Sequence, residues 1–138
     1  MRSSLIDAGP VIALFDNSDQ YHVQVLNFLR EYEGRLISTW PVLTEVCYML
    51  DFNSKTQLDF LDWVLDGGIE IHNLEQWQIG GIREKMNTYA DLPADFADTS
   101  LLEVAETRNL ENIITIDRDF SVYRLSKGRR LINLLAKR

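Results

Sequence analysis

The hydrophobic and polar positions of this chain follow two periodicities that replace each other along the sequence. Short, nearly continuous apolar runs predict strands near residues 3–7, 35–38, 69–72, 112–116 and 131–135. Between these runs, apolar residues recur every three or four positions, which predicts helices over residues 10–16, 20–33, 41–52, 55–66, 75–89 and 97–108. The pattern therefore predicts strands and helices in alternation.

Alternation of this kind requires crossover connections, and such connections produce a mainly parallel sheet. The strands are apolar throughout, as expected when helices cover both faces of the sheet. The composition agrees, because 138 residues with 46% hydrophobic and 25% charged side chains are typical of one folded domain. We therefore predict a single α/β domain over residues 1–138, with a central, mostly parallel five-stranded sheet flanked by helices in a three-layer fold.

Four acidic residues occupy positions that secondary structure alone explains poorly. Asp7 ends the first apolar run and Asp117 ends the fourth, so both are expected at the carboxyl edge of the sheet, where open α/β proteins place their sites. Glu45 and Asp98 lie on or beside the apolar faces of two predicted helices. Buried acids usually pair with a base or bind a metal ion. If the fold brings the four together, their oxygen ligands suit Mg²⁺ or Mn²⁺.

Each acid also has an ordinary structural explanation. Asp7 stands just before a predicted helix and suits its N-cap, whereas Asp117 and Asp119 suit a turn after a strand. Glu45 suits a surface position at the margin of its helix. Capping and exposure explain each acid separately, but they explain the set poorly.

Two acids share the start of the helix predicted over residues 97–108. Asp98 lies on its inward side, and Asp95 precedes Asp98 by three residues. An acid near a helix N-terminus interacts favourably with the helix dipole, and one cap is sufficient. We therefore predict that Asp98 is a metal ligand and that Asp95 is a cap or a second ligand. Asp119 is a further candidate ligand beside Asp117.

The charge of the chain is distributed unevenly. The net charge of −7 disfavours nucleic acid as a partner, but no acid follows Asp119. Such asymmetry suits an acidic metal centre beside a basic strip that contacts phosphates, and a solvated charged end explains it equally well. The basic residues after Asp119 are Arg124, Lys127, Arg129, Arg130, Lys137 and Arg138.

Other chemistries find little support. Cys47 is the only cysteine, which excludes an intrachain disulfide and favours the cytoplasm, and no apolar run is long enough to cross a membrane. His22 and His72 are the only histidines and belong to no zinc-binding pattern, and neither a glycine-rich phosphate loop nor a nucleophilic serine motif occurs. The tryptophans have aliphatic neighbours, so we predict core or interface positions rather than base-stacking platforms for Trp40, Trp63 and Trp77.

Four segments together resemble the PIN-domain ribonucleases, in particular the VapC-like toxins of prokaryotic toxin–antitoxin pairs. The opening of that family is similar to Leu5-Ile6-Asp7-Ala8-Gly9-Pro10-Val11-Ile12-Ala13-Leu14, and its second motif to Thr44-Glu45-Val46. Its third and fourth motifs are similar to Pro93-Ala94-Asp95-Phe96-Ala97-Asp98-Thr99-Ser100-Leu101 and Thr115-Ile116-Asp117-Arg118-Asp119-Phe120. The resemblance spans nearly the whole chain, with the motifs in the family's order and spacing.

The resemblance implies a PIN-like fold and the hydrolysis of RNA phosphodiester bonds with Mg²⁺ or Mn²⁺. It also implies a homodimer and a small antitoxin protein that blocks the active-site cleft. The residue match assigns the catalytic acids to Asp7, Glu45, Asp98 and Asp117. Asp95 and Asp119 would be accessory, and Thr115 would place a hydroxyl near the metal. For the basic strip we predict contacts to the RNA backbone from Arg124, Lys127, Arg129 and Arg130.

Two other functions remain open from the sequence. One is another Mg²⁺-dependent α/β phosphohydrolase, although a receiver domain needs an acceptor aspartate where Asn73-Leu74-Glu75 follows the third predicted strand. A dehalogenase-type phosphatase needs two acids after the first strand, and Ala8-Gly9 supplies none. The other function is a PIN-like module that binds a partner protein without catalysis.

Overall fold

The computed structural model describes residues 2–137, without the side chain of Lys137. Arg138 and that side chain, both counted in the predicted basic strip, lie outside the described residues. The strands are β1 (Ser3–Ile6), β2 (Arg35–Ser38), β3 (Glu70–Ile71), β4 (Asn112–Ile114) and β5 (Ile132–Asn133). The α-helices are α1 (Ala8–Phe15), α2 (His22–Glu31), α3 (Trp40–Met49), α4 (Ser54–Leu65), α5 (Ile79–Thr88) and α6 (Phe96–Arg108).

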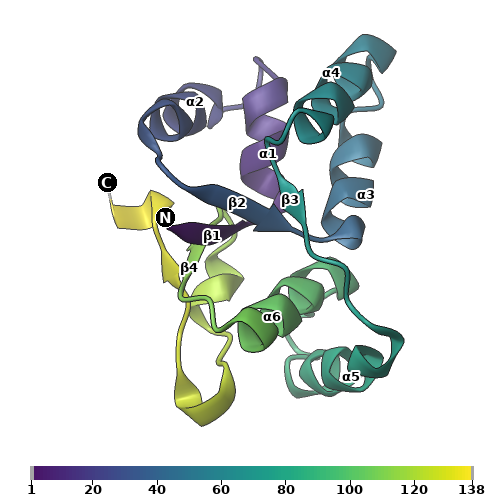
Figure 1. Cartoon of the computed structure of the whole chain (residues 1–138), viewed down its shortest axis with the longest axis vertical. Helices are drawn as coiled ribbons and strands as arrows, with labels where there is room; N and C mark the ends of the chain where they lie inside the picture. Colours follow the sequence, from purple (N-terminus) through teal and green to yellow (C-terminus); the bar gives the residue numbers. More distant parts are fainter. Residues whose placement is uncertain (1, 138) are drawn as a thin grey trace.

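The five strands form one sheet in the order β3-β2-β1-β4-β5, and each neighbouring pair is parallel. The first strand is therefore central, with Leu5 aligned to Ile37 of β2 on one side and to Ile113 of β4 on the other. Figure 1 shows α1, α2 and α4 on one side of the sheet and α5 and α6 on the other. This architecture confirms the predicted three-layer α/β fold.

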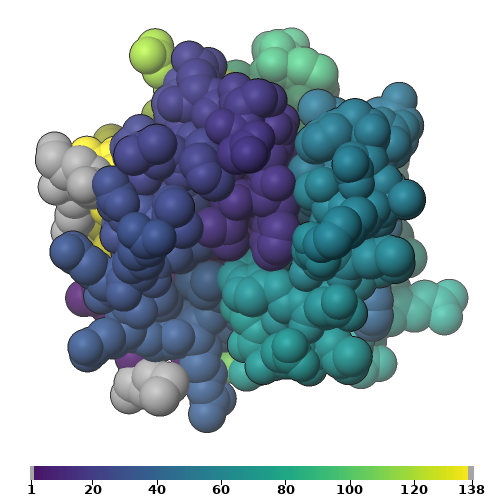
Figure 2. All heavy atoms as spheres, turned by 90° about the horizontal axis from the view of Figure 1, so that it is seen from above, coloured from purple at the N-terminus to yellow at the C-terminus, as the bar shows by residue number. Residues whose placement is uncertain are grey.

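The helices cover the central strand so completely that Leu5 and Ile6 have no exposed surface. On the face shown in Figure 2, α1 lies between α2 and α4, which places its buried residues directly over the sheet. On the other face, α6 is buried along most of its length from Ala97 to Ala105. No helix within residues 2–137 has both the length and the apolarity that a bilayer-crossing segment needs.

The ends of several elements differ from the prediction, and side-chain hydrogen bonds explain two of the differences. The segment predicted as one helix over residues 75–89 is a 3₁₀ turn, Gln76–Gln78, followed by α5. Here the side-chain oxygen of Gln78 accepts a hydrogen bond from the backbone of Glu75 at 2.9 Å. Strand β4 ends at Ile114, because the next residue pairs with the side chain of Asn133 instead of a strand backbone.

The tryptophans were predicted at core or interface positions, and one of the three lies against the core. Trp63 packs against Phe15, with ring centroids 5.5 Å apart. Trp40 and Trp77, in contrast, are 58% and 76% exposed. Trp40 is the first residue of α3 and Trp77 lies in the 3₁₀ turn, so both side chains project from element ends rather than from a helix face that meets the sheet.

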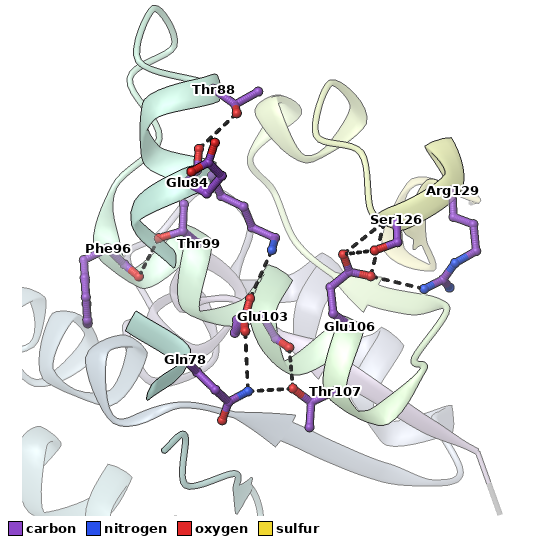
Figure 3. Close-up of polar contacts among 11 residues, drawn as sticks. Gln78, Glu84, Thr88, Phe96, Thr99, Glu103, Glu106, Thr107, Ser126 and Arg129 are labelled. Atoms are coloured by element: carbon purple, nitrogen blue, oxygen red, sulfur yellow. Dashed lines mark hydrogen bonds and ion pairs between the residues drawn. The ribbon is translucent and has the colours of Figure 1, made fainter. Parts of the chain in front are cut away.

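A polar network joins α5 to α6 on the side of the sheet opposite α1 (Figure 3). Lys85 forms an ion pair with Glu103 at 3.0 Å, and both side chains are largely buried. Gln78 donates to Thr107 at 2.8 Å and to Glu103 at 3.5 Å. The two helices approach closely at Gly81, where a Cβ atom would lie 2.5 Å from a Glu103 oxygen.

Candidate metal centre

Three of the four predicted acids converge at the carboxyl edge of the sheet. One carboxylate oxygen from each of Asp7, Asp98 and Asp117 lies within 4.8 Å of the other two. Asp7 follows β1, Asp98 lies in the first turn of α6, and Asp117 follows β4 by three residues. Asp7 and Asp98 are only 5% and 8% exposed, and Asp117 is the most open of the three.

Asp7 and Asp117 have structural roles in addition to their place in the cluster. Oδ1 of Asp7 accepts a hydrogen bond from the backbone of Ala8 at 2.8 Å and caps α1, which explains why this helix begins two residues before its predicted start. Oδ1 of Asp117 accepts from the backbone of Asp119 at 2.9 Å and shapes the turn into a 3₁₀ helix, Arg118–Ser121. Each residue therefore has the structural role that the sequence offered, and its carboxylate still belongs to the cluster.

Asp95 and Asp98 divide the roles that the sequence left open. Oδ1 of Asp95 accepts from the backbone of Asp98 at 2.8 Å, so Asp95 is the N-cap of α6. Asp98 points into the cluster, and its Oδ2 accepts a hydrogen bond from the hydroxyl of Tyr123 at 3.1 Å. The sequence analysis missed Tyr123, which lies 25 residues from Asp98 and carries no local motif.

Thr115 holds two of the aspartates in place. Its hydroxyl donates to Oδ2 of Asp7 at 3.0 Å and accepts from the backbone of Asp117 at 3.0 Å. Thr115 is itself fixed by Asn133, whose side-chain amide donates to its carbonyl at 3.0 Å and accepts from its N–H at 3.2 Å. Asn133 is a second residue that the sequence analysis missed.

Burial and mutual repulsion make the cluster difficult to ionise. Burial raises the pKa of Asp7 from 3.8 to about 7, against the lowering effect of its hydrogen bonds to Ala8 and Thr115. Burial, followed by the neighbouring charges of Asp7 and Asp95, raises the pKa of Asp98 from 3.8 to about 8. Among residues 2–137, no lysine or arginine forms an ion pair with Asp7, Asp98 or Asp117.

This donor set fits a divalent cation. Clustered carboxylate oxygens are the ligands that Mg²⁺ and Mn²⁺ prefer, and a cation would supply the positive charge that the protein itself does not provide. Oδ1 of Asp98 and Oδ2 of Asp117 accept no hydrogen bond from the described residues, so both oxygens remain available to a metal.

Glu45 and Asp119 lie outside the group of three aspartates. Glu45, on α3, is still close enough for its charge to contribute to the raised pKa of Asp7. Its own pKa is raised by burial first and then by Asp95 and Asp117. Asp119 contacts the cluster through its backbone N–H, which donates to Asp117. Glu45 is thus placed at the rim of the acidic centre.

The predicted basic strip divides into residues bound within the chain and residues that face solvent. The Arg124 guanidinium donates to the carbonyls of Ser121, Val122 and Tyr123, and Arg129 contacts Glu106 at 3.5 Å. Lys127 and Arg130 are exposed. Arg130 also lines a cavity of about 450 Å³ that reaches Asp117, together with Arg118, a base that the sequence analysis did not single out.

Comparison with known proteins yields structural neighbours only, since no family model and no curated protein matches the sequence. VapC20 from Mycobacterium tuberculosis, a toxin that cleaves the sarcin-ricin loop, aligns with a TM-score of 0.78 and 15% identity over 86% of this chain and 92% of its own. VapBC2 from Rickettsia felis, bound to a DNA fragment from its promoter, aligns with a TM-score of 0.62 and 15% identity over 95% of this chain and 98% of its own. PAE2754 from Pyrobaculum aerophilum aligns with a TM-score of 0.55 and 18% identity over 99% of this chain and 94% of its own.

These likenesses establish the architecture. The alignments cover at least 86% of every chain compared, so this chain shares with the three proteins the arrangement of its sheet and helices. The chain therefore has the fold of these proteins, two of which bear the VapC or VapBC name, as the sequence motifs predicted.

Proposed function

We propose that this protein is a Mg²⁺- or Mn²⁺-dependent endoribonuclease and the toxin of a toxin–antitoxin pair. The observation that carries the proposal is the convergence of Asp7, Asp98 and Asp117, without a basic partner, at the carboxyl edge of a VapC-like sheet. An acidic cluster of this kind is costly to the fold unless it binds a cation. The absence of a basic partner within the described residues favours a metal over a structural ion pair.

Asp7, Asp98 and Asp117 would hold the metal, and Glu45 at the rim would orient water or substrate beside it. When bound, Mg²⁺ or Mn²⁺ supplies a Lewis acid for the phosphate oxygens and lowers the pKa of water. Thr115 and Tyr123 keep the carboxylates of Asp7 and Asp98 in position through their hydroxyl groups. Preorganisation of this kind favours catalysis, because the ligands need not reorganise during the reaction.

Arg118 and Arg130 are the bases best placed to contact a phosphate backbone near the cluster, because both line the cavity that reaches Asp117. Lys127 would extend the contact from its exposed position, whereas Arg124 and Arg129 already bind groups of the chain itself. A backbone-binding strip beside an acidic centre suits a single-stranded or looped RNA, which can bring one phosphate to the metal.

The partners follow from the same neighbours. VapBC2 was solved bound to a DNA fragment from its promoter, and VapC20 is a toxin that cleaves the sarcin-ricin loop. We propose a cognate antitoxin, an RNA substrate and a homodimer for the present chain. The rival proposal, a PIN-like module that only binds a protein, lacks a reason for three aspartates to share one site.

Two substitutions and a control test the proposal. The protein is assayed for RNA cleavage with Mg²⁺ or Mn²⁺, and its melting temperature is measured with and without Mn²⁺. We expect cleavage by the wild type, a Mn²⁺-induced rise in melting temperature, and the loss of both in Asp7→Asn and Asp98→Asn. Asp59→Asn, on exposed α4, should behave as the wild type. Full metal-dependent cleavage by Asp98→Asn would refute the site, and a wild type without any response to Mn²⁺ would support the non-catalytic module.

A further inference from the structure

Trp40 is an exposed aromatic side chain that is held in one orientation. Its ring is 58% exposed, yet its Nε1 donates a hydrogen bond to Oδ1 of Asn73 at 2.7 Å. Phe96, 46% exposed, is the first residue of α6, and Figure 3 shows its side chain directed away from the α5–α6 network. Exposed aromatic rings cost free energy in water, so two of them at one place call for a ligand.

Both rings border a small cavity of about 210 Å³ beyond the carboxyl ends of β2 and β3. Its walls are aromatic and aliphatic, from Trp40, Phe96 and Ile79, and its polar lining residues include His72 and Glu75. The combination of flat apolar walls with a few polar groups is typical of a pocket that takes a planar ring with polar edges.

The cavity shares walls with a groove that reaches the rim of the acidic centre. Trp40 and Phe96 also line an adjoining groove whose other walls include Glu45 and Asp95. The connection follows from the fold, because α3 begins at Trp40 and carries Glu45, while α6 begins at Phe96 and carries Asp98. A polymer with one phosphate at the aspartates would therefore pass along this groove.

We propose that the cavity receives the base of an unpaired nucleotide that neighbours the scissile phosphate, with Trp40 and Phe96 as its stacking walls. The inference rests on the proposed ribonuclease function and adds a recognition subsite to it. Bases of single-stranded RNA stack readily on aromatic side chains, and His72 and Glu75 supply hydrogen-bonding groups for the base edge.

A nucleobase fits better than a segment of a partner protein. Stable protein interfaces bury about 800 Å² on each partner, whereas this cavity of about 210 Å³ has room for a single ring. The walls that the cavity shares with the groove at Glu45 and Asp95 also favour a place on the path of the substrate rather than on a separate face. A subsite of this kind would make cleavage depend on the nucleotide that it holds.

The test compares two exposed tryptophans. Trp40→Leu removes the proposed stacking face and keeps an apolar wall, and Trp77→Leu is the matched control, since Trp77 is 76% exposed and lines neither the cavity nor the groove. Each substitution is made separately in Asp98→Asn protein, and the binding of a randomised ten-nucleotide single-stranded RNA is measured by fluorescence anisotropy. We expect Trp40→Leu to weaken binding about 5- to 100-fold, the usual cost of losing one base stack, and Trp77→Leu to leave it within twofold.

Abasic substitution locates the nucleotide. In an RNA that the wild type cuts at one bond, replacement of one nucleotide near that bond by an abasic residue should slow cleavage at least tenfold. The same replacement should slow cleavage by Trp40→Leu protein less than twofold, because this variant has already lost the ring on which the base would stack. Equal RNA binding by Trp40→Leu and Trp77→Leu would overturn the subsite and leave Trp40 as a protein contact. RNA binding that depends on Trp40 without any metal-dependent cleavage would instead contradict the proposed ribonuclease function.

Discussion

The hydroxyl of Tyr123 donates a hydrogen bond to Oδ2 of Asp98 across 3.1 Å, from a ring that is almost completely buried. That ring packs edge-on against Tyr89 and Phe120, with centroids 5.0 and 5.1 Å away. Burial and the neighbouring Asp98 raise the pKa of Tyr123, so its hydroxyl stays protonated and remains a donor. An aromatic cluster beneath the site thus fixes the orientation of one carboxylate.

Replacement of Tyr123 by Phe should weaken the metal site without removing a ligand. We expect the Mn²⁺ dissociation constant of Tyr123→Phe, measured by titration calorimetry, to rise about 10-fold or more, since a hydrogen bond to a charged group contributes about 1.5–3 kcal/mol. Tyr89→Phe is the control, because the Tyr89 hydroxyl accepts from the backbone of Arg124 and contacts no acid. Equal Mn²⁺ affinities of the two variants would show that Tyr123 does not position Asp98.

The stability of the metal-free protein should fall as the pH rises from about 5 to 8. Asp7 and Asp98 have folded-state pKa values of about 7 and 8, well above 3.8, so the folded state binds more protons than the unfolded state in this range. Stability must therefore decrease with increasing pH. In urea titrations with EDTA, the unfolding free energy of Asp98→Asn should exceed that of the wild type by about 1–3 kcal/mol at pH 8 and by less at pH 5. A constant difference across this range would contradict the raised pKa values.

Asn133 should matter for stability and for metal binding at once. Asn133→Ala removes both hydrogen bonds to the Thr115 backbone, and we expect a loss of about 1–3 kcal/mol in unfolding free energy. Because Thr115 anchors Asp7 and Asp117, Mn²⁺ affinity should fall as well. The control is Asn87→Ala on the exposed side of α5. Loss of stability with unchanged Mn²⁺ affinity would show that the site does not depend on this support.

The buried ion pair between α5 and α6 should be a stability element that is separate from the metal centre. Lys85→Met leaves Glu103 charged and without its partner, at an expected cost of about 3 kcal/mol. The exposed pair of Lys55 and Asp59 is the comparison, and Lys55→Met should cost less than about 1 kcal/mol. Thermal and urea unfolding give both values. Comparable costs for the two substitutions would mean that the α5–α6 pair is not effectively buried.

The bases near Asp117 should differ from the rest of the predicted strip in their contribution to RNA binding. Arg118→Ala and Arg130→Ala should each reduce the slope of log affinity against log salt by about 1, as expected for the loss of one phosphate contact. Arg124→Ala should mainly lower stability, because its guanidinium donates to three backbone carbonyls. An unchanged slope for Arg118→Ala and Arg130→Ala would exclude the cavity beside Asp117 from the RNA path.

The sequence predicted the fold and the three aspartates because these depend on patterns that are local. An apolar run followed by Asp7 or Asp117 already indicates a strand and its carboxyl end, and the parallel sheet brings such ends together. The choice between Asp95 and Asp98 required a structure, because two acids in one helical turn are equivalent until the helix is packed. The hydrogen bond from the Asp98 backbone to Asp95 then decides which of them caps.

The supporting residues could not be predicted, since each acts on a distant part of the chain. Tyr123 reaches back 25 residues to Asp98, and Asn133 reaches back 18 to Thr115. The exposure of Trp40 was hidden for a different reason. Aliphatic neighbours suggest burial, but as the first residue of α3 Trp40 projects beyond the contact between that helix and the sheet.

The central place of β1 has a kinetic consequence. The hydrogen bond between Asp7 and Thr115 joins residues 108 positions apart, and the pairing of β1 with β4 closes a loop of similar length. Loops of that length close late, because their entropy must be lost before the contact stabilises the chain. Partly folded forms of this protein would accordingly have no assembled cation site, and the capacity to cut would arrive with the last step of folding rather than accumulate along the way.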